Sequence, residues 1–260
     1  MKAGVTPIRV FAASDVGQVR TVNQDSYFTG PVPEDCTLTH GMLLLVADGM
    51  GGHAAGEVAS TLAIETIFSN YYTEPLEADD DPVPALRRAF QAANQAILVA
   101  GQRDHRHFGM GTTCTGLLLR GRQAWYSHVG DTRIYRYRGG ALEQITRDHT
   151  LVQQMVDKGD LEPEEIHRLP IKHILVRAMG SDERVEIDVS EEPFAVKRGD
   201  RFLISSDGLH DLLDPDQIAE LLANDDGQAV VKALTKAANG AGAPDNVTVL
   251  LAEWDDSEGK

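Results

Sequence analysis

The chain has 260 residues, of which 42% are hydrophobic, enough for a substantial core in one large domain or two small ones. Its formal net charge is −16 and no basic patch or arm is present, which argues against a general nucleic-acid role. No apolar run approaches the roughly 20 residues that span a bilayer, and residues 1–10 lack the pattern of a signal peptide. The only cysteines, Cys36 and Cys114, make no disulfide framework and favour a reduced, cytoplasmic location.

The first half of the chain predicts strands and two helices. Residues 8–13 form a first strand, residues 14–17 are rich in turn formers, and a second strand begins near Tyr27. The apolar run 42–47 is short and bounded, which indicates a buried strand. Apolar residues at three- and four-residue spacing predict helices over residues 55–72 and 86–100. The acidic segment between them, residues 74–84, lacks the ligand spacing of a calcium loop and is predicted to be a solvated loop.

The second half is rich in strands and then alternates. Strands are predicted over residues 111–119, 123–129, 133–138, 141–145, 185–189, 201–205 and 247–253, and helices over residues 216–222 and 227–239. Short connections in the middle imply an antiparallel meander. Polar residues 148–170 contain two helix-like pieces, split near Gly159 and Pro163, and the tail 255–260 is predicted to be flexible. Without regular βαβ alternation, the pattern favours an α+β layered fold.

Five aspartates occupy corners of this predicted structure. Asp48 follows the apolar strand 42–47 and enters the Gly-rich stretch Gly49-Met50-Gly51-Gly52-His53. Asp25, Asp131, Asp207 and Asp245 lie at comparable strand ends or turns. Because the ends of paired strands are neighbours in a sheet, these carboxylates are expected to converge although they are far apart in sequence.

Carboxylates that converge cannot all stay ionised without compensation, and divalent cations supply it. Oxygen ligands select Mg²⁺ or Mn²⁺ over zinc or copper, and the chain has neither an HExxH motif nor a cysteine cluster. Asp-Gly is also a common turn dipeptide. Each aspartate taken alone therefore favours a turn, and the metal hypothesis depends on the whole set.

Seven short motifs in one order extend this pattern. They are Ser14-Asp15-Val16-Gly17 with Arg20 and Asn23-Gln24-Asp25-Ser26; Val46-Ala47-Asp48-Gly49-Met50-Gly51-Gly52-His53; Met110-Gly111-Thr112-Thr113; Val129-Gly130-Asp131-Thr132-Arg133; Asp148-His149-Thr150-Leu151; Ser205-Ser206-Asp207-Gly208-Leu209; and Asp245-Asn246-Val247-Thr248. With them, residues 9–253 resemble the PPM family of metal-dependent protein serine/threonine phosphatases (type 2C), in its compact bacterial form.

The resemblance implies one phosphatase domain over residues 1–260: a four-layer αββα sandwich of two antiparallel sheets flanked by helices, with a surface flap at about residues 148–178. It implies hydrolysis of phosphoserine and phosphothreonine by direct attack of a hydroxide that bridges two Mn²⁺ or Mg²⁺ ions, with a third ion in bacterial members. Metal ions lower the pKa of bound water and clamp the attacking and leaving oxygens. The implied partners are phosphorylated proteins, namely a eukaryotic-like Ser/Thr kinase or its substrates.

The matched positions carry the family's metal roles. Asp48 would bridge the two ions, and the carbonyl of Gly49 would ligate one of them. Asp207 and Asp245 would complete the protein ligands of the other ion. Asp25 matches the partner of a metal-bound water.

Further matches and departures concern the rest of the site. Asp131 matches the position of the third ion, and Arg20 the phosphate-binding arginine, whose planar fork suits phosphate oxygens. Gln24 stands where the family often has glutamate, and this neutral side chain gives the site one negative charge fewer. Met50 replaces the histidine of eukaryotic relatives, so His53 is considered as the general acid, with a metal-bound water as the alternative.

Two other functions stay open at this point. A non-catalytic phosphoprotein-binding or regulatory domain could share the fold, although such a relative would be expected to lose its metal aspartates. A different hydrolase or metal-binding module could also use the acids. Near the polar flap, His149 and His173 are predicted to pack or to face solvent. The flap itself is expected to meet the phosphoprotein substrate.

Overall fold

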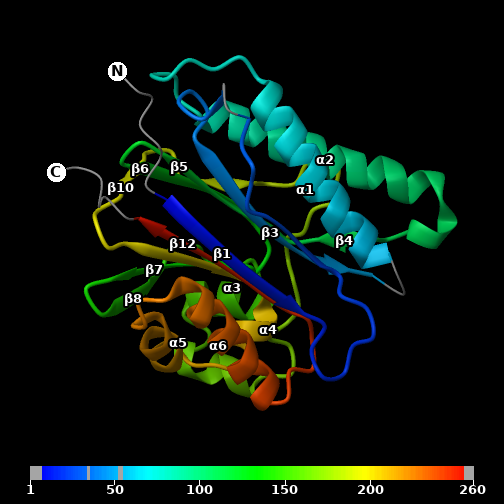
Figure 1. Cartoon of the computed structure of the whole chain (residues 1–260). Helices are drawn as coiled ribbons and strands as arrows, with labels where there is room; N and C mark the ends of the chain where they lie inside the picture. Colours follow the sequence, from blue (N-terminus) through cyan, green and yellow to red (C-terminus); the bar gives the residue numbers. More distant parts are fainter. Residues whose placement is uncertain (1–7, 34–35, 52–54, 255–260) are drawn as a thin grey trace.

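The computed structural model describes residues 8–33, 36–51 and 55–254, and within them two antiparallel sheets face each other (Figure 1). The first sheet has the order β1 (Ile8–Asp15), β12 (Val247–Trp254), β11 (Arg201–Ser205), β7 (Arg133–Arg138) and β8 (Ala141–Gln144). The second has the order β10 (Phe194–Ala195), β6 (Gln123–Val129), β5 (Cys114–Arg120), β3 (Met42–Met50) and β2 (Asp25–Phe28). The short strands β4 (Gly111–Thr112) and β9 (Asp188–Val189) pair with β3 and β6.

Helices cover the outer face of each sheet, as Figure 1 shows. Helices α1 (Ala55–Thr73) and α2 (Val83–Arg103) pack on the second sheet, and α6 (Gly227–Gly240) packs on β1 and β12. Two shorter helices, α4 (Asp207–His210) and α5 (Pro215–Leu222), lie on the side of α6, and the 3₁₀ turn η2 (His105–His107) follows α2. The order of layers is helix, sheet, sheet, helix, which confirms the predicted αββα architecture.

Three hydrophobic clusters correspond to the three interfaces between these layers. Phe90 and Ile67 lie in the cluster between the long helices and the second sheet. Phe202 belongs to the cluster between the sheets, and Leu234 and Leu251 to the cluster beneath α6. All five side chains are almost fully buried, so burial of apolar area holds the layers together.

The helices that follow turns begin at side chains that satisfy free backbone N–H groups. Asp214 and Gln217 form a reciprocal capping box at the start of α5, where Pro215 occupies the first turn. Asp226 accepts from the N–H groups of Gln228 and Ala229 at the start of α6. These local signals place the helix starts where the apolar spacing predicted them.

Three predicted strands differ from the structure. The strand predicted over residues 111–119 is divided into β4 and β5 at Thr113, because the Thr113 hydroxyl accepts from the N–H of Asp48 (3.0 Å) where a ladder carbonyl would otherwise stand. Strand β3 continues past its predicted end to Met50, so Asp48 and Gly49 belong to the strand and not to a turn. Of the strand predicted over residues 185–189, only Asp188–Val189 is a strand.

The flap at residues 148–178 contains the two helical pieces that were predicted. Helix α3 (Leu151–Lys158) begins at Thr150, whose side chain accepts from the N–H of Gln153, and ends at Gly159 with a φ of 76°. The 3₁₀ helix η3 (Pro163–Arg168) follows. Within the described ranges, no helix is both long and apolar enough to cross a membrane. The predicted tail 255–260 and His53, the proposed acid, lie outside the described residues.

Candidate active site

A cavity of about 350 Å³ opens at one end of the sandwich. Its lining comes from seven separate parts of the chain: Arg20, Gln24, Asp48, Gly49, Met50, Gly51, Thr113, Asp131, His173, Leu175, Asp207 and Asp245. Four of the five predicted aspartates therefore line one cavity. The fifth, Asp25, lies directly opposite Asp48 in the β2–β3 ladder. The predicted convergence of these carboxylates is confirmed.

The proximity of the carboxylates perturbs their ionisation. Burial, followed by the negative charges of Asp25 and Asp207, raises the pKa of Asp48 well above its usual value. Burial likewise raises the pKa of Asp25 to about 7, against the opposing hydrogen bonds of Thr248 and Ser206. Asp48 and Asp25 therefore resist ionisation in this buried cluster, and a bound cation would relieve that cost.

Unpaired oxygens in the site test whether metal ions would fit. The Oδ1 atoms of Asp25 and Asp207 are both buried and have no hydrogen-bond partner among the described residues. The other oxygen of Asp25, Oδ2, accepts from the hydroxyl of Ser206 (2.8 Å). Buried polar atoms are normally paired, so oxygens left open inside an all-oxygen cluster suit a hard divalent cation. The donor set fits Mn²⁺ or Mg²⁺.

Asp131 is held in the turn between β6 and β7. Asp131 is only 7% exposed. Burial, and after it the negative charge of Asp207, raises the pKa of Asp131 well above the usual value. The next residue, Thr132, shares a hydroxyl hydrogen bond of 2.6 Å with Thr113. Because Thr113 also binds the backbone of Asp48, a short buried chain of hydrogen bonds links the strand that carries Asp48 to the turn that carries Asp131.

Arg20 lies at the edge of the cavity and ion-pairs with Asp245, with 2.7 Å between Nη2 and Oδ2. This bond raises the pKa of Arg20, whose side chain is half exposed. The loop that carries Arg20 is held by Asn246, which donates to the carbonyls of Val16 and Val22. An arginine at the rim beside buried acids can receive the oxygens of an incoming phosphate.

Asn246 also accepts from the N–H of Gln24 (2.8 Å), and the carbonyl of Gln24 accepts from the N–H of Gly49 (3.1 Å). Strand β3 and helix α1 approach closely here. A Cβ on Gly49 would lie 2.1 Å from the carbonyl oxygen of Gly56 and 2.6 Å from that of Gln24. The glycine after Asp48 is therefore required for packing of the helix start against the strand, in addition to any role of its carbonyl.

His173 is a cavity residue that the sequence did not indicate. Its Nδ1 lies 3.1 Å from Asp211 Oδ2 and 3.8 Å from Asp207 Oδ2, and these acids raise its pKa. The preceding residue, Lys172, binds the other oxygen of Asp211 (3.1 Å). The prediction that His173 packs or faces solvent agrees with its side chain, which is 55% exposed. It did not place His173 at the cavity, because that position depends on how the flap folds back over α4.

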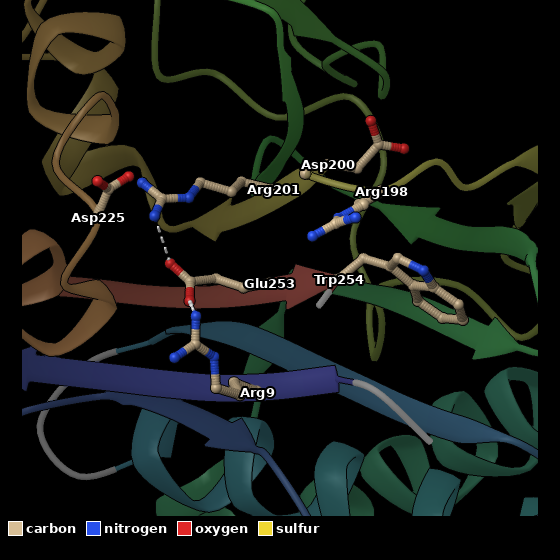
Figure 2. Close-up of a pocket in the computed structure, with 8 residues that line it drawn as sticks. Arg9, Arg198, Asp200, Arg201, Asp225, Glu253 and Trp254 are labelled. Atoms are coloured by element: carbon tan, nitrogen blue, oxygen red, sulfur yellow. Dashed lines mark ion pairs between the residues drawn. The ribbon is translucent and has the colours of Figure 1, made fainter. Parts of the chain in front are cut away.

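Figure 2 shows a second cavity, of about 260 Å³, at the far end of β1 and β12. The buried carboxylate of Glu253 lies there between Arg9 and Arg201, with ion pairs of 3.0 and 2.8 Å. Both arginines are cross-strand partners of Glu253 in the ladder. This cluster ties three strands of the first sheet together, so we assign it a structural role.

The layered fold and the acidic cavity are those of a metal-dependent phosphatase. Residues 17–239 match the sequence model of the family described as "Protein phosphatase 2C", and the chain belongs to this family. It is 38% identical over 246 residues to the serine/threonine protein phosphatase PstP of Mycobacterium tuberculosis, covering 95% of this chain but only 45% of that protein. It is 32% identical to the protein phosphatase PhpP of Streptococcus pneumoniae, covering 94% of this chain and 97% of that protein.

A solved structure extends the likeness from the sequence to the fold. The catalytic domain of PstP in complex with two manganese ions superposes with a TM-score of 0.82 at 38% identity, covering 96% of this chain and 99% of that one. The predicted family and fold are therefore confirmed, and the predicted dependence on a divalent metal agrees with the two manganese ions of that relative. The non-catalytic alternative is not supported, because the matched relatives are named as phosphatases.

Proposed function

We propose that this protein hydrolyses phosphoserine and phosphothreonine in proteins. The observation that carries the proposal is the convergence of Asp48, Asp131, Asp207 and Asp245 on one cavity, with Arg20 at its rim. When bound there, two divalent cations supply a nucleophile at neutral pH and neutralise charge on the phosphate. The side chains of the cavity would hold the two cations and the phosphate in position.

Each residue has a distinct part in this proposal. Asp48, with the carbonyl of Gly49, would hold the first ion and share the second with Asp207 and Asp245. Support comes from the open, buried oxygen of Asp207 and from the position of Asp48 inside a fixed strand. Asp25 would accept a hydrogen bond from water at the ions, because its Oδ1 is buried and open while Ser206 holds its other oxygen.

Two further residues complete the proposed site. Asp131, buried in its turn and near enough to Asp207 for that charge to raise its pKa, would hold a third ion. Arg20 would exchange its bond with Asp245 for one with phosphate once Asp245 serves a cation, since a guanidinium fork suits phosphate oxygens. His53 remains a proposal as the proton donor.

One assay tests the function. Phosphate release from a phosphothreonine peptide is measured with Mn²⁺, with EDTA, and in Asp207→Asn. We expect release that requires Mn²⁺ and is lost in the variant. Release without metal, or none from the intact protein with Mn²⁺, would refute the proposal.

For the cellular setting we propose phosphoproteins of a eukaryotic-like Ser/Thr kinase, or that kinase itself, as substrates, in the cytoplasm. The resemblance to compact bacterial members supports the kinase, and the buried free thiols of Cys36 and Cys114 support a reducing compartment. Phosphoproteomics after deletion of the gene tests the first point: sites of one such kinase should gain phosphate. Cell fractionation tests the second.

A further inference from the structure

His149, at the root of the flap, contacts both the Asp131 turn and the returning flap segment. Its backbone N–H donates to the carbonyl of Gly130 (2.7 Å), and its own carbonyl accepts from the N–H of Val176 (2.9 Å). Its side-chain Nδ1 lies 3.0 Å from the N–H of Gly130. The side chain is 6% exposed. A single buried residue thus joins the turn before Asp131 to both ends of the flap.

The hydrogen-bond partners of the ring determine its tautomer. A backbone N–H can only donate, so Nδ1 must be the acceptor from Gly130 and the proton must be on Nε2. Nε2 then donates to Asp188 Oδ2, 3.2 Å away, and Arg177 Nη1, although 3.1 Å from Nε2, cannot bond to it because both atoms carry protons. Arg177 donates to the other oxygen of Asp188 (2.6 Å). Asp188 and Arg177 therefore hold the ring in the orientation that the Gly130 N–H requires.

The Gly130 turn has little freedom to find another arrangement. Gly130 has a φ of 109°, and a Cβ there would lie 2.5 Å from the side chain of Thr113. Because the turn is packed against Thr113 and buried, water cannot readily replace His149 as the acceptor of the Gly130 N–H. The direction in which the next residue, Asp131, leaves the turn is fixed by this hydrogen bond.

We propose that His149 is a positioning residue for Asp131: through Gly130 it holds this carboxylate at the third-metal position and links that position to the flap. The inference rests on the proposed function of Asp131. In this role the ring of His149 is neutral, with its proton on Nε2, and Nδ1 accepts from Gly130. The carbonyl of His149 makes the second contact, with the N–H of Val176 in the returning flap segment. Movement of the flap root would move the Asp131 turn, and loss of the Nδ1 acceptor would loosen it.

Two variants separate positioning from packing. In His149→Asn, the amide oxygen occupies the place of Nδ1 and can still accept from Gly130, while the contact with Asp188 is lost. In His149→Gln, the amide nitrogen occupies the place of Nε2 and can still donate to Asp188, while the acceptor for Gly130 is lost. Glutamine fills the ring volume better than asparagine. If His149 only fills space, His149→Gln should disturb Mn²⁺ binding at Asp131 less than His149→Asn does. If His149 positions Asp131, His149→Gln should disturb that binding more.

The measurements use the full chain. Titration calorimetry with Mn²⁺ gives the dissociation constant of the most weakly bound ion. We expect this constant to rise about 10- to 100-fold in His149→Gln, the cost typical of a lost outer-shell partner. In His149→Asn it should rise by no more than about threefold. Without metal, NMR should show the Nε2–H tautomer of His149 and faster hydrogen exchange of the Gly130 amide in His149→Gln alone.

The outcomes distinguish this inference from the proposed function. If Asp131→Asn binds Mn²⁺ as the unaltered protein does, the third-metal assignment of Asp131 is wrong. If Asp131→Asn loses the weakest ion but His149→Gln does not, or if the ring carries its proton on Nδ1, the role of His149 is refuted while that of Asp131 stands.

Discussion

Asp25 and Asp48 lie directly opposite each other in the β2–β3 ladder, so two carboxylates face one another at the edge of the cavity. Like charges at opposed positions of a sheet destabilise it. The fold therefore holds a pair that disfavours the metal-free state and favours a bound cation.

Removing one charge of this pair should stabilise the metal-free protein. We expect Asp48→Asn to raise the free energy of unfolding in EDTA by about 1 kcal/mol, the upper range for a cross-strand pair. The same variant should lose the stabilisation by Mn²⁺ and at least about 100-fold in activity, as removal of a metal ligand exceeds the cost of an outer-shell partner. Urea denaturation with and without Mn²⁺ checks both. Exposed Asp79→Asn is the control, and equal effects in both variants would contradict the prediction.

The metal-free protein should lose stability as the pH rises. Because the pKa of Asp25 is about 7 in the folded chain against 3.8 for an unperturbed aspartate, the folded state holds a proton that the unfolded state releases. The stability of that protonated form is present at low pH and is lost as the pH rises toward 7. We expect the Tm in EDTA to be lower at pH 8 than at pH 6 by at least about 2–4 °C, the equivalent of 1 kcal/mol.

Saturating Mn²⁺ should reverse that trend, because the positive charge of the ions favours the ionised form of Asp25, and Asp25→Asn should flatten it. Calorimetric scans at both pH values provide the measurement. A metal-free Tm that rises between pH 6 and pH 8 would show that other groups dominate.

Substitutions of Arg20 should act on phosphate and not on metal. We expect Arg20→Ala to lower kcat/KM by about 10-fold or more, which corresponds to one charged hydrogen bond. Arg20→Lys should recover little, because an ammonium lacks the planar fork. The stabilisation by Mn²⁺ should persist in both variants, since Asp245 loses a competitor for the ion. Steady-state kinetics and thermal shifts test this, and a loss of Mn²⁺ binding would give Arg20 a structural role.

Removal of residues 158–169 from the flap should affect protein substrates most. These residues cover the end of α3 and η3, whereas Lys172 and His173, which contact Asp211, remain. We expect hydrolysis of a small aryl phosphate to change by less than about threefold, while kcat/KM for a phosphoprotein falls by about 10-fold or more, equivalent to 1.4 kcal/mol of binding. Equal losses on both substrates would exclude a role of the flap in recognition.

Gly49→Ala should destabilise the fold beside the site. The added Cβ would meet the carbonyl oxygens of Gly56 and Gln24 at 2.1 and 2.6 Å, so strand and helix must separate. We expect a loss of about 2 kcal/mol or more, typical of overpacking. Gly240→Ala at the end of α6, where a Cβ meets nothing within 4 Å, should be neutral or stabilising by up to about 1 kcal/mol. Chemical denaturation of both variants makes the comparison.

Much of the candidate site could be predicted because its signals are local. The Asp-Gly and Asp-Asn corners, the apolar spacing of α1 and the capping residues of α5 are each set by neighbours in sequence. The order of the motifs then indicated the family. The position of His173 could not be predicted in this way, because its partner Asp211 is reached only after the flap folds back over α4.

The sequence by itself determined the residue chemistry: oxygen ligands, an arginine at the start of the chain, and helices and strands in the order of a layered α+β fold. Tertiary structure alone decided that Asp48 belongs to a strand, because β3 exchanges its partner β5 for β4 at the Thr113 hydroxyl. It also decided that His149 serves the Asp131 turn. The physical reason is the same in both cases. These contacts join segments that are distant in sequence, and they form because a buried backbone N–H group needs an acceptor that only the folded chain brings close.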